Sequence, residues 1–189
     1  MLKTSQIEPS GKTEDQYTGY LSQVYAESLG IFGIPLLLPL SQGWILKRKI
    51  SESSFYDAMG SYPLFCCQNW SKLFTDIEHI GNNLVSLSIV ADPFGEYELS
   101  ELKRCFKDIV LPFKTHYIVD LKIPMDQNVS ARHRYYVRKS NRSVHIFRCK
   151  KPATLIEKWC ELYDVLIDRH GITGIKAFSK KSFEKQMIY

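Results

Sequence analysis

The chain has 189 residues, of which 44% are hydrophobic and 24% charged, and this composition suits one globular domain with a sizeable core. Its five cysteines are an odd number without CxxC spacing, which argues against a disulfide framework or a zinc site and favours a reducing compartment. The polar N-terminus lacks a signal peptide's apolar core, and the longest apolar run, Leu29 to Leu40, is shorter than the roughly 20 residues of a membrane span. We therefore expect a cytoplasmic protein without a membrane span.

The N-terminal third predicts a helix followed by a hairpin. Residues 1–14 are expected to form a solvated polar tail, and residues 15–189 a single lobe. Aromatic and aliphatic side chains recur at helical spacing between Tyr17 and Tyr25. Two apolar segments, 31–40 and 44–50, are joined by Ser41-Gln42-Gly43, which indicates a β-hairpin.

The middle of the chain alternates between strand and helix patterns. Short strands are predicted at 62–66, 84–91 and 117–121. The first is followed by a helix over 70–80 that Gly81 ends, and the second by a helix over 99–109. Trp70 lies on the apolar face of its helix, so we expect it in the core.

The C-terminal third contains a basic helix at 131–142, with Ser130 as its N-cap, and then a strand at 144–148. A strongly amphipathic helix at 155–171 ends at Gly171, and Ser179 opens a last short helix. Trp159, on the apolar face of the amphipathic helix, is predicted to be buried. The mixture of elements predicts an α/β (α+β) fold with a largely antiparallel central sheet flanked by helices.

The positive charge of the chain is concentrated in residues 127–156. This window contains eight Lys or Arg residues and no acidic residue, whereas the rest of the chain has 17 basic and 20 acidic residues. A concentrated patch builds a local potential that attracts anions.

Four segments in their order resemble the first half of two-lobed GNAT-type acyltransferases of the Fem-like (FemAB-type) kind. The segments are 33–40, 57–64, 91–94 with 114–121, and 130–139 with 162–171. The resemblance implies a GNAT-like lobe that helps to transfer an acyl or aminoacyl group to an amine. It implies acyl-CoA or an aminoacyl donor in a full-length relative, and a second GNAT-like lobe, which would begin about where this chain ends.

One expected feature of a CoA-binding lobe is missing. Such a lobe has a glycine-rich loop between strand and helix, because backbone N–H groups must approach the pyrophosphate closely. The matching junction here, Cys66 to Ser71, contains no glycine. Gly171 and Gly174 follow a helix, and Gly171 is interpreted as a helix cap. We therefore expect that this lobe binds no cofactor, CoA included.

The candidate binding residues are mostly on the basic helix. The guanidinium groups of its arginines could hold a phosphate or carboxylate through paired hydrogen bonds, although a series of charged residues like this one could equally be a solvated face. Tyr135 and Tyr136 could stack on a base or sugar, or could pack half inside. The candidate substrate-binding residues are Arg132, His133, Arg134, Tyr136, Arg138, Arg142, His116 and Asp120.

No catalytic residue can be named from the sequence. His116 and Asp120 would share one face of a strand, and with His133 they could form an acid/base group, although a single strand histidine is more often structural. Cys66 and Cys67 are expected to be buried, inert thiols. No metal site is expected.

Two functions from different classes remain open. The first is a GNAT/Fem-like acyltransferase lobe that binds an anionic acceptor, such as a sugar phosphate or a cell-envelope precursor, through the basic helix. The alternative is a non-catalytic nucleic-acid- or anion-binding module that uses helix 131–142. Binding through many phosphates weakens steeply with salt, which would distinguish the two.

Overall fold

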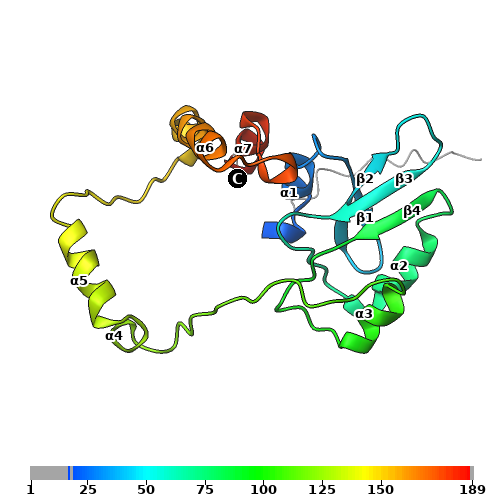
Figure 1. The fold of residues 1–189 in the computed structure, drawn as a ribbon, viewed down its shortest axis with the longest axis horizontal. Coiled ribbons are helices and arrows are strands. Elements are labelled where there is room, and N and C mark those ends of the chain that lie inside the picture. Colours follow the sequence, from blue (N-terminus) through cyan, green and yellow to red (C-terminus); the bar gives the residue numbers. More distant parts are fainter. Residues whose placement is uncertain (1–16, 18, 188–189) are drawn as a thin grey trace, which may run out of the picture.

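The computed structural model describes residue 17 and residues 19–187. The polar tail predicted for residues 1–14 lies outside the described residues. The chain forms a body around one sheet, an arm of residues 107–150 that leaves this body, and a C-terminal helical segment that returns to it (Figure 1).

The sheet has four strands in the order β1-β2-β3-β4: β1 (Ile34–Leu38), β2 (Gly43–Lys49), β3 (Tyr56–Gly60) and β4 (Leu84–Ser88). The predicted hairpin is confirmed, because β1 and β2 are antiparallel with Leu38 opposite Gly43. β2 and β3 are also antiparallel, whereas β3 and β4 are parallel. The last pair is connected through the helical segment that lies between them in the chain.

The strand predicted at 62–66 is misplaced. The regular strand in this region is β3, six residues earlier, and from 62–66 only Phe65 forms a bridge, a parallel one with Ala91. Pro63 interrupts the segment, and proline has no N–H to give to a ladder. β3 itself carries Asp57 and two small residues, Ala58 and Gly60, which weaken the strand signal in its sequence.

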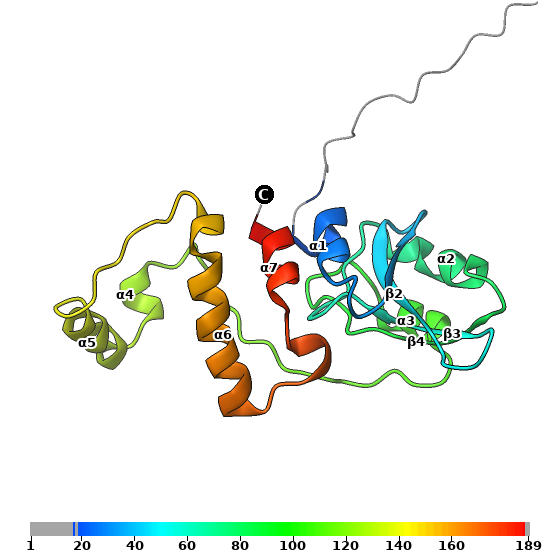
Figure 2. The ribbon, with the colours of Figure 1, turned by 90° about the horizontal axis from the view of Figure 1, so that it is seen from above.

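Helices cover both faces of the sheet (Figure 2). On one face lie the 3-10 turn η2 (Trp70–Lys72), α2 (Leu73–His79) and α3 (Leu99–Cys105). On the other lie the turn η1 (Gly19–Leu21) and α1 (Gln23–Ser28). The main core forms under α2 and comprises Leu38, Ile45, Ala58, Phe65, Cys67, Trp70 and Leu73. The burial predicted for Trp70 is confirmed, since it is 5% exposed.

The arm carries α4 (Met125–Asn128) and α5 (Ala131–Ser140) far from the sheet (Figure 1). The predicted basic helix and its N-cap are confirmed, because the Ser130 hydroxyl accepts a hydrogen bond from His133 N. The strands predicted at 117–121 and 144–148 are not formed. Their alternating pattern is compatible with a strand, but neither segment has a neighbouring strand with which to pair.

The chain returns through the turn η3 (Pro152–Leu155), α6 (Ile156–His170), the turn η4 (Gly174–Lys176) and α7 (Lys180–Met187). Gly171 ends α6 with φ 57°, so the predicted glycine cap is confirmed. α7 packs between α6 and α1 (Figure 2). The core position predicted for Trp159 is wrong, because this side chain is 48% exposed. Its ring meets that of Phe183 of α7 edge-on, so α7 covers only part of this side chain.

The predicted fold class is confirmed: the chain is a mixed α/β protein with a largely antiparallel sheet flanked by helices. Among the described residues, no helix has both the length and the apolar character needed to cross a membrane.

Candidate functional site

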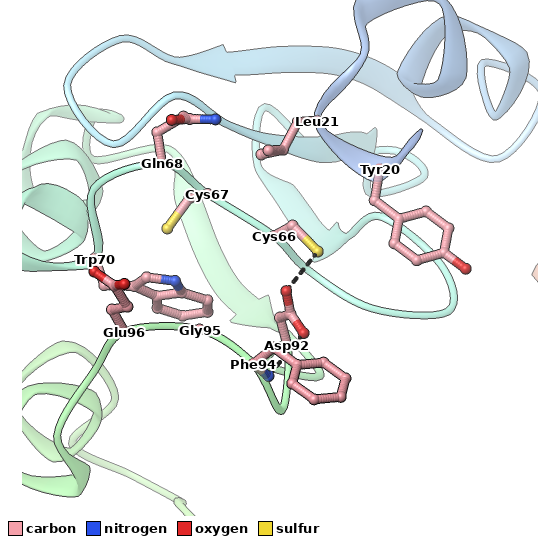
Figure 3. A pocket seen from close by; sticks show the side chains of 10 residues that line it. All are labelled: Tyr20, Leu21, Cys66, Cys67, Gln68, Trp70, Asp92, Phe94, Gly95 and Glu96. Atoms are coloured by element: carbon pink, nitrogen blue, oxygen red, sulfur yellow. Dashed lines mark hydrogen bonds between the residues drawn. The ribbon is translucent and has the colours of Figure 1, made fainter. Parts of the chain in front are cut away.

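A hollow of about 400 Å³ lies where the chain leaves the two parallel strands (Figure 3). One wall is formed by the segment 66–70, which comes after β3 and the bridge at Phe65 in the chain. The other is formed by the segment 92–96, which comes after β4 and the bridge at Ala91. Ligands commonly bind outside the carboxyl ends of parallel strands, because the chain diverges there. The hollow is lined by the rings of Tyr20, Trp70 and Phe94 and by the polar side chains of Cys66, Gln68, Asp92 and Glu96.

Asp92 is the best-positioned polar group of the hollow. Its Oδ2 accepts a hydrogen bond from the Cys66 thiol at 3.3 Å, and its Oδ1 accepts one from Phe94 N at 3.0 Å. Gly95 lets the following loop lie against the Trp70 ring, since a Cβ there would come within 2.7 Å of the indole. The loop therefore holds the carboxylate in place and leaves the Phe94 ring 71% exposed at the rim.

The two thiols beside this carboxylate are poor nucleophiles. Burial raises the pKa of Cys66 to about 12, and the hydrogen bond to Asp92 and its negative charge act in the same direction. Burial also raises the pKa of Cys67 to about 12. Both side chains are therefore protonated at neutral pH, as expected of inert thiols.

At the junction between β3 and α2, the backbone N–H groups of Gln68 and Asn69 are already engaged in hydrogen bonds. Gln68 N and Asn69 N both donate to the Ser41 carbonyl, at 2.8 and 3.0 Å. Ser41 is itself held by the buried Asp76, whose Oδ2 accepts from the Ser41 N–H and hydroxyl, each at 2.6 Å. The N–H groups that a phosphate cradle would use at this position are thus committed to the hairpin turn.

The rim of the hollow is acidic. A second, shallower hollow adjoins it and is lined by Gly95, Glu96, Tyr97, Glu98 and Glu101. The segment 92–101 therefore has four carboxylates and no Lys or Arg. Among the described residues, none of these carboxylates forms an ion pair. Together with the aromatic rings, they make this part of the body electrostatically attractive to cations.

The sequence-predicted binding residues lie elsewhere, on the arm. Arg132, His133, Tyr136, Arg138 and Arg142 are all exposed, and the Arg132 guanidinium lies over the Tyr136 ring at 5.8 Å. α5 lies on the arm, far from the sheet beside which the hollow opens (Figure 1).

Arg134 differs from the other arginines of α5. It is half-buried, and its guanidinium donates to the carbonyl oxygens of Asp126 and Val129. These bonds tie α4 to the beginning of α5.

The three residues considered for acid/base chemistry are not brought together. Among the described residues, no hydrogen bond joins His116, Asp120 and His133 to one another. The Asp120 carboxylate accepts from Lys122 N, and His133 Nδ1 lies 3.1 Å from the Ser130 hydroxyl. Because 117–121 is not a strand, the shared strand face expected for His116 and Asp120 does not exist.

Sequence reasoning did not select Asp92 or Phe94 as site residues. Both lie in a segment that it noted only as a pattern, Ala91-Asp92-Pro93-Phe94. An acidic residue directly after the strand predicted at 84–91 is the signal that could have identified them, because such a position falls at a carboxyl strand end. In the described part of the chain, no three His, Cys, Asp or Glu side chains are grouped in a way that could hold a metal ion.

Comparisons of the chain with protein-family models, with curated proteins and with solved structures return no match.

Proposed function

We propose that this chain is the acceptor-binding lobe of a cytoplasmic acyltransferase of the GNAT/Fem-like kind, which transfers an acyl or aminoacyl group to an amine. The observation that carries the proposal is the aromatic and acidic hollow at the carboxyl ends of β3 and β4. A mixed, largely antiparallel sheet flanked by helices is also the kind of fold that the resemblance implies.

The hollow suits an amine. An ammonium group is attracted by the Asp92 carboxylate and by the faces of the Tyr20 and Phe94 rings. For transfer, the amine must lose a proton before its lone pair attacks the carbonyl carbon of a thioester or aminoacyl ester. The new C–N bond replaces the C–S or C–O bond, and the donor leaves as a thiol or alcohol. We assign Asp92 to hold the amine and to accept its proton.

The donor would be held outside this lobe. The engaged amides of Gln68 and Asn69 and the lack of glycine between Cys66 and Ser71 support a lobe that holds no CoA pyrophosphate. In the proposed enzyme, a second GNAT-like lobe holds acyl-CoA or an aminoacyl donor. The exposed cations of α5 lie far from the sheet beside which the hollow opens (Figure 1), so they would attract the anionic part of a long acceptor such as a cell-envelope precursor, whereas a small sugar phosphate with its amine in the hollow would not reach them.

The amine-binding role is tested with a matched pair of ligands. Calorimetric titration with glucosamine 6-phosphate should give tighter binding than glucose 6-phosphate, which lacks the amine. Asp92→Asn should remove the difference, because the amide has no charge for the ammonium. Glu78→Gln, an exposed carboxylate on α2 away from the hollow, is the control. Equal binding of the two sugars, or an unchanged difference in Asp92→Asn, would refute the role of Asp92.

The donor assignment has a separate test. Titration of the chain with acetyl-CoA should give no saturable heat. A micromolar isotherm that Gln68→Ala or Asn69→Ala abolishes would place the donor site in this lobe.

A second function is favoured by the exposure of α5. Arg138, Lys139 and Arg142 point into solvent beside the exposed Tyr135 and Tyr136, an arrangement suited to single-stranded nucleic acid. Binding of a fluorescent oligonucleotide would then fall steeply with salt. Binding with this dependence, combined with no discrimination between the two sugars, would favour the nucleic-acid function.

A further inference from the structure

The arm exposes apolar side chains that a folded chain normally covers. Tyr117 is 96% exposed, Leu121 92%, Ile146 81% and Phe147 77%. In 117–121 the apolar Tyr117, Val119 and Leu121 alternate with Ile118 and Asp120, which is the pattern of a strand with one covered face. The segment therefore has the composition of a strand but lacks both a neighbouring strand and a covering layer.

The body has a matching open edge. β4 is the last strand of the sheet, and no further strand of the described chain pairs with its outer side. The outer edge of such a strand presents N–H and C=O groups that can template another strand. At 55% exposure, Val85 of β4 is also uncovered. A strand added at this edge would extend the sheet and gain main-chain hydrogen bonds.

The charges of the arm and the body are complementary. Residues 127–156 contain eight cations and no acid, whereas 92–101 contain four acids and no cation. Within the described residues, none of these charged side chains takes part in an ion pair. In each copy the two charged surfaces lie apart, with the arm held away from the body (Figures 1 and 2).

We propose that two copies of this chain associate by exchanging arms. The segment Tyr117–Leu121 of one copy adds to the β4 edge of the other, and the basic window 127–156 lies near the partner's acidic segment 92–101. The connection 107–116 has no helix or strand and can span up to roughly 33 Å, so it can carry the arm across. An element held away from its own body by such a connection is what reciprocal exchange requires.

The exposed surface is large enough for a stable dimer. A standard interface buries about 800 Å² on each partner. Aromatic side chains bury roughly 150–250 Å² each, and Tyr117 and Phe147 are supplemented by three uncovered aliphatic side chains, those of Val119, Leu121 and Ile146. Because the exchange is reciprocal, this surface is buried twice in each dimer.

Size-exclusion chromatography with light scattering tests the association on the full chain. We expect a species of twice the 21.9 kDa chain mass at micromolar concentration. Val119→Lys should convert it to a monomer, because a charge on the covered face opposes pairing. Leu162→Lys, which alters an equally exposed residue of α6, should remain dimeric. A monomeric parent, or a dimer lost in Leu162→Lys and kept in Val119→Lys, would overturn the proposal.

Cross-linking distinguishes exchange between copies from closure within one. In a background in which the five native cysteines are replaced by serine or alanine, a variant with Ser86→Cys on β4 and Ile118→Cys on the arm would be treated with a short bismaleimide. Exchange predicts a covalent dimer, and mixing the two single variants should give the same product, whereas each single variant alone should not. An intramolecular link on a monomer would show that the arm folds back on its own body and would overturn the proposal.

Discussion

Replacing Asp76 should be among the most damaging changes in the body. This carboxylate, at the start of α2, is 2% exposed and holds the turn between β1 and β2. Its Oδ2 accepts from the N–H and hydroxyl of the fully buried Ser41, and both of its oxygens accept from Leu40 N, at 3.1 and 3.2 Å. Asp76→Ala would leave two donors of Ser41 and one of Leu40 without their acceptor.

The magnitude follows from these contacts. A hydrogen bond to a charged group contributes about 1.5–3 kcal/mol, and a buried donor left without a partner costs about 1–3 kcal/mol. With two fully buried donors and one partly buried donor, Asp76→Ala should destabilise the fold by roughly 3–6 kcal/mol. That is a large fraction of the about 5–15 kcal/mol that holds a domain folded.

Urea unfolding followed by tryptophan fluorescence measures the effect. Asp57→Ala is the matched control, because Asp57 pairs with Arg48 at the surface at 2.7 Å and such pairs contribute at most about 1 kcal/mol. Ser41→Ala removes only the hydroxyl donor and should lie between the two. If Asp76→Ala and Asp57→Ala unfold at the same urea concentration, the network around Ser41 does not carry the stability inferred for it.

Three further outcomes are expected. Trp70→Ala should lower the free energy of unfolding by roughly 3–5 kcal/mol, because it empties a site in the core. Trp159 is half-exposed, so Trp159→Ala should lower it by less than about 2 kcal/mol. Equal losses in urea unfolding would contradict the difference in burial. Because burial raises the pKa of Cys66 to about 12, its alkylation by iodoacetamide, followed by peptide mass spectrometry, should rise about tenfold per pH unit up to pH 11, and a plateau near pH 9 would contradict this. Asp92→Asn should lower the pKa of Cys66 and so make alkylation faster at a given pH, since the negative carboxylate disfavours the thiolate. Sulfate at low ionic strength should raise the melting temperature by binding to the cations of α5 and the adjoining Arg142, and the double variant Arg138→Ala/Arg142→Ala should abolish this rise. The control is Lys72→Ala/Lys103→Ala, which removes two cations of the body. If sulfate raises the melting temperature of all three proteins equally, α5 is only a solvated face.

The raised thiol pKa also predicts how stability depends on pH. In the unfolded chain Cys66 and Cys67 lose their protons near the ordinary thiol pKa of 9.0, but in the folded protein the pKa of each is about 12. The folded state therefore retains these protons in a range where the unfolded state has released them, so stability should fall as pH rises above about 9. A Cys66→Ser/Cys67→Ala variant should show a shallower fall in melting temperature between pH 9 and pH 11.

Features that depend on local sequence were predictable. Ser130 begins the basic helix and Gly171 ends α6 because capping involves residues only a few positions apart. The hairpin of β1 and β2 follows from two apolar segments and a three-residue turn. The mixed α/β class follows in turn from the order of these elements.

Features that depend on contacts between residues far apart in the sequence became visible only in the tertiary structure. The segment 117–121 has a strand pattern, but a strand also requires a neighbour to accept its hydrogen bonds, and the arm lies away from the strands of its own sheet (Figure 1). Trp70 and Trp159 both lie on apolar helix faces, yet only Trp70 has the sheet and the Gly95 loop packed over it. The hollow beside Asp92 likewise exists because β3 and β4, 28 positions apart at the paired Tyr56 and Leu84, are parallel neighbours that end side by side. Local sequence determines which elements can form, and contacts between distant residues determine which of them are paired, buried or brought to a common site.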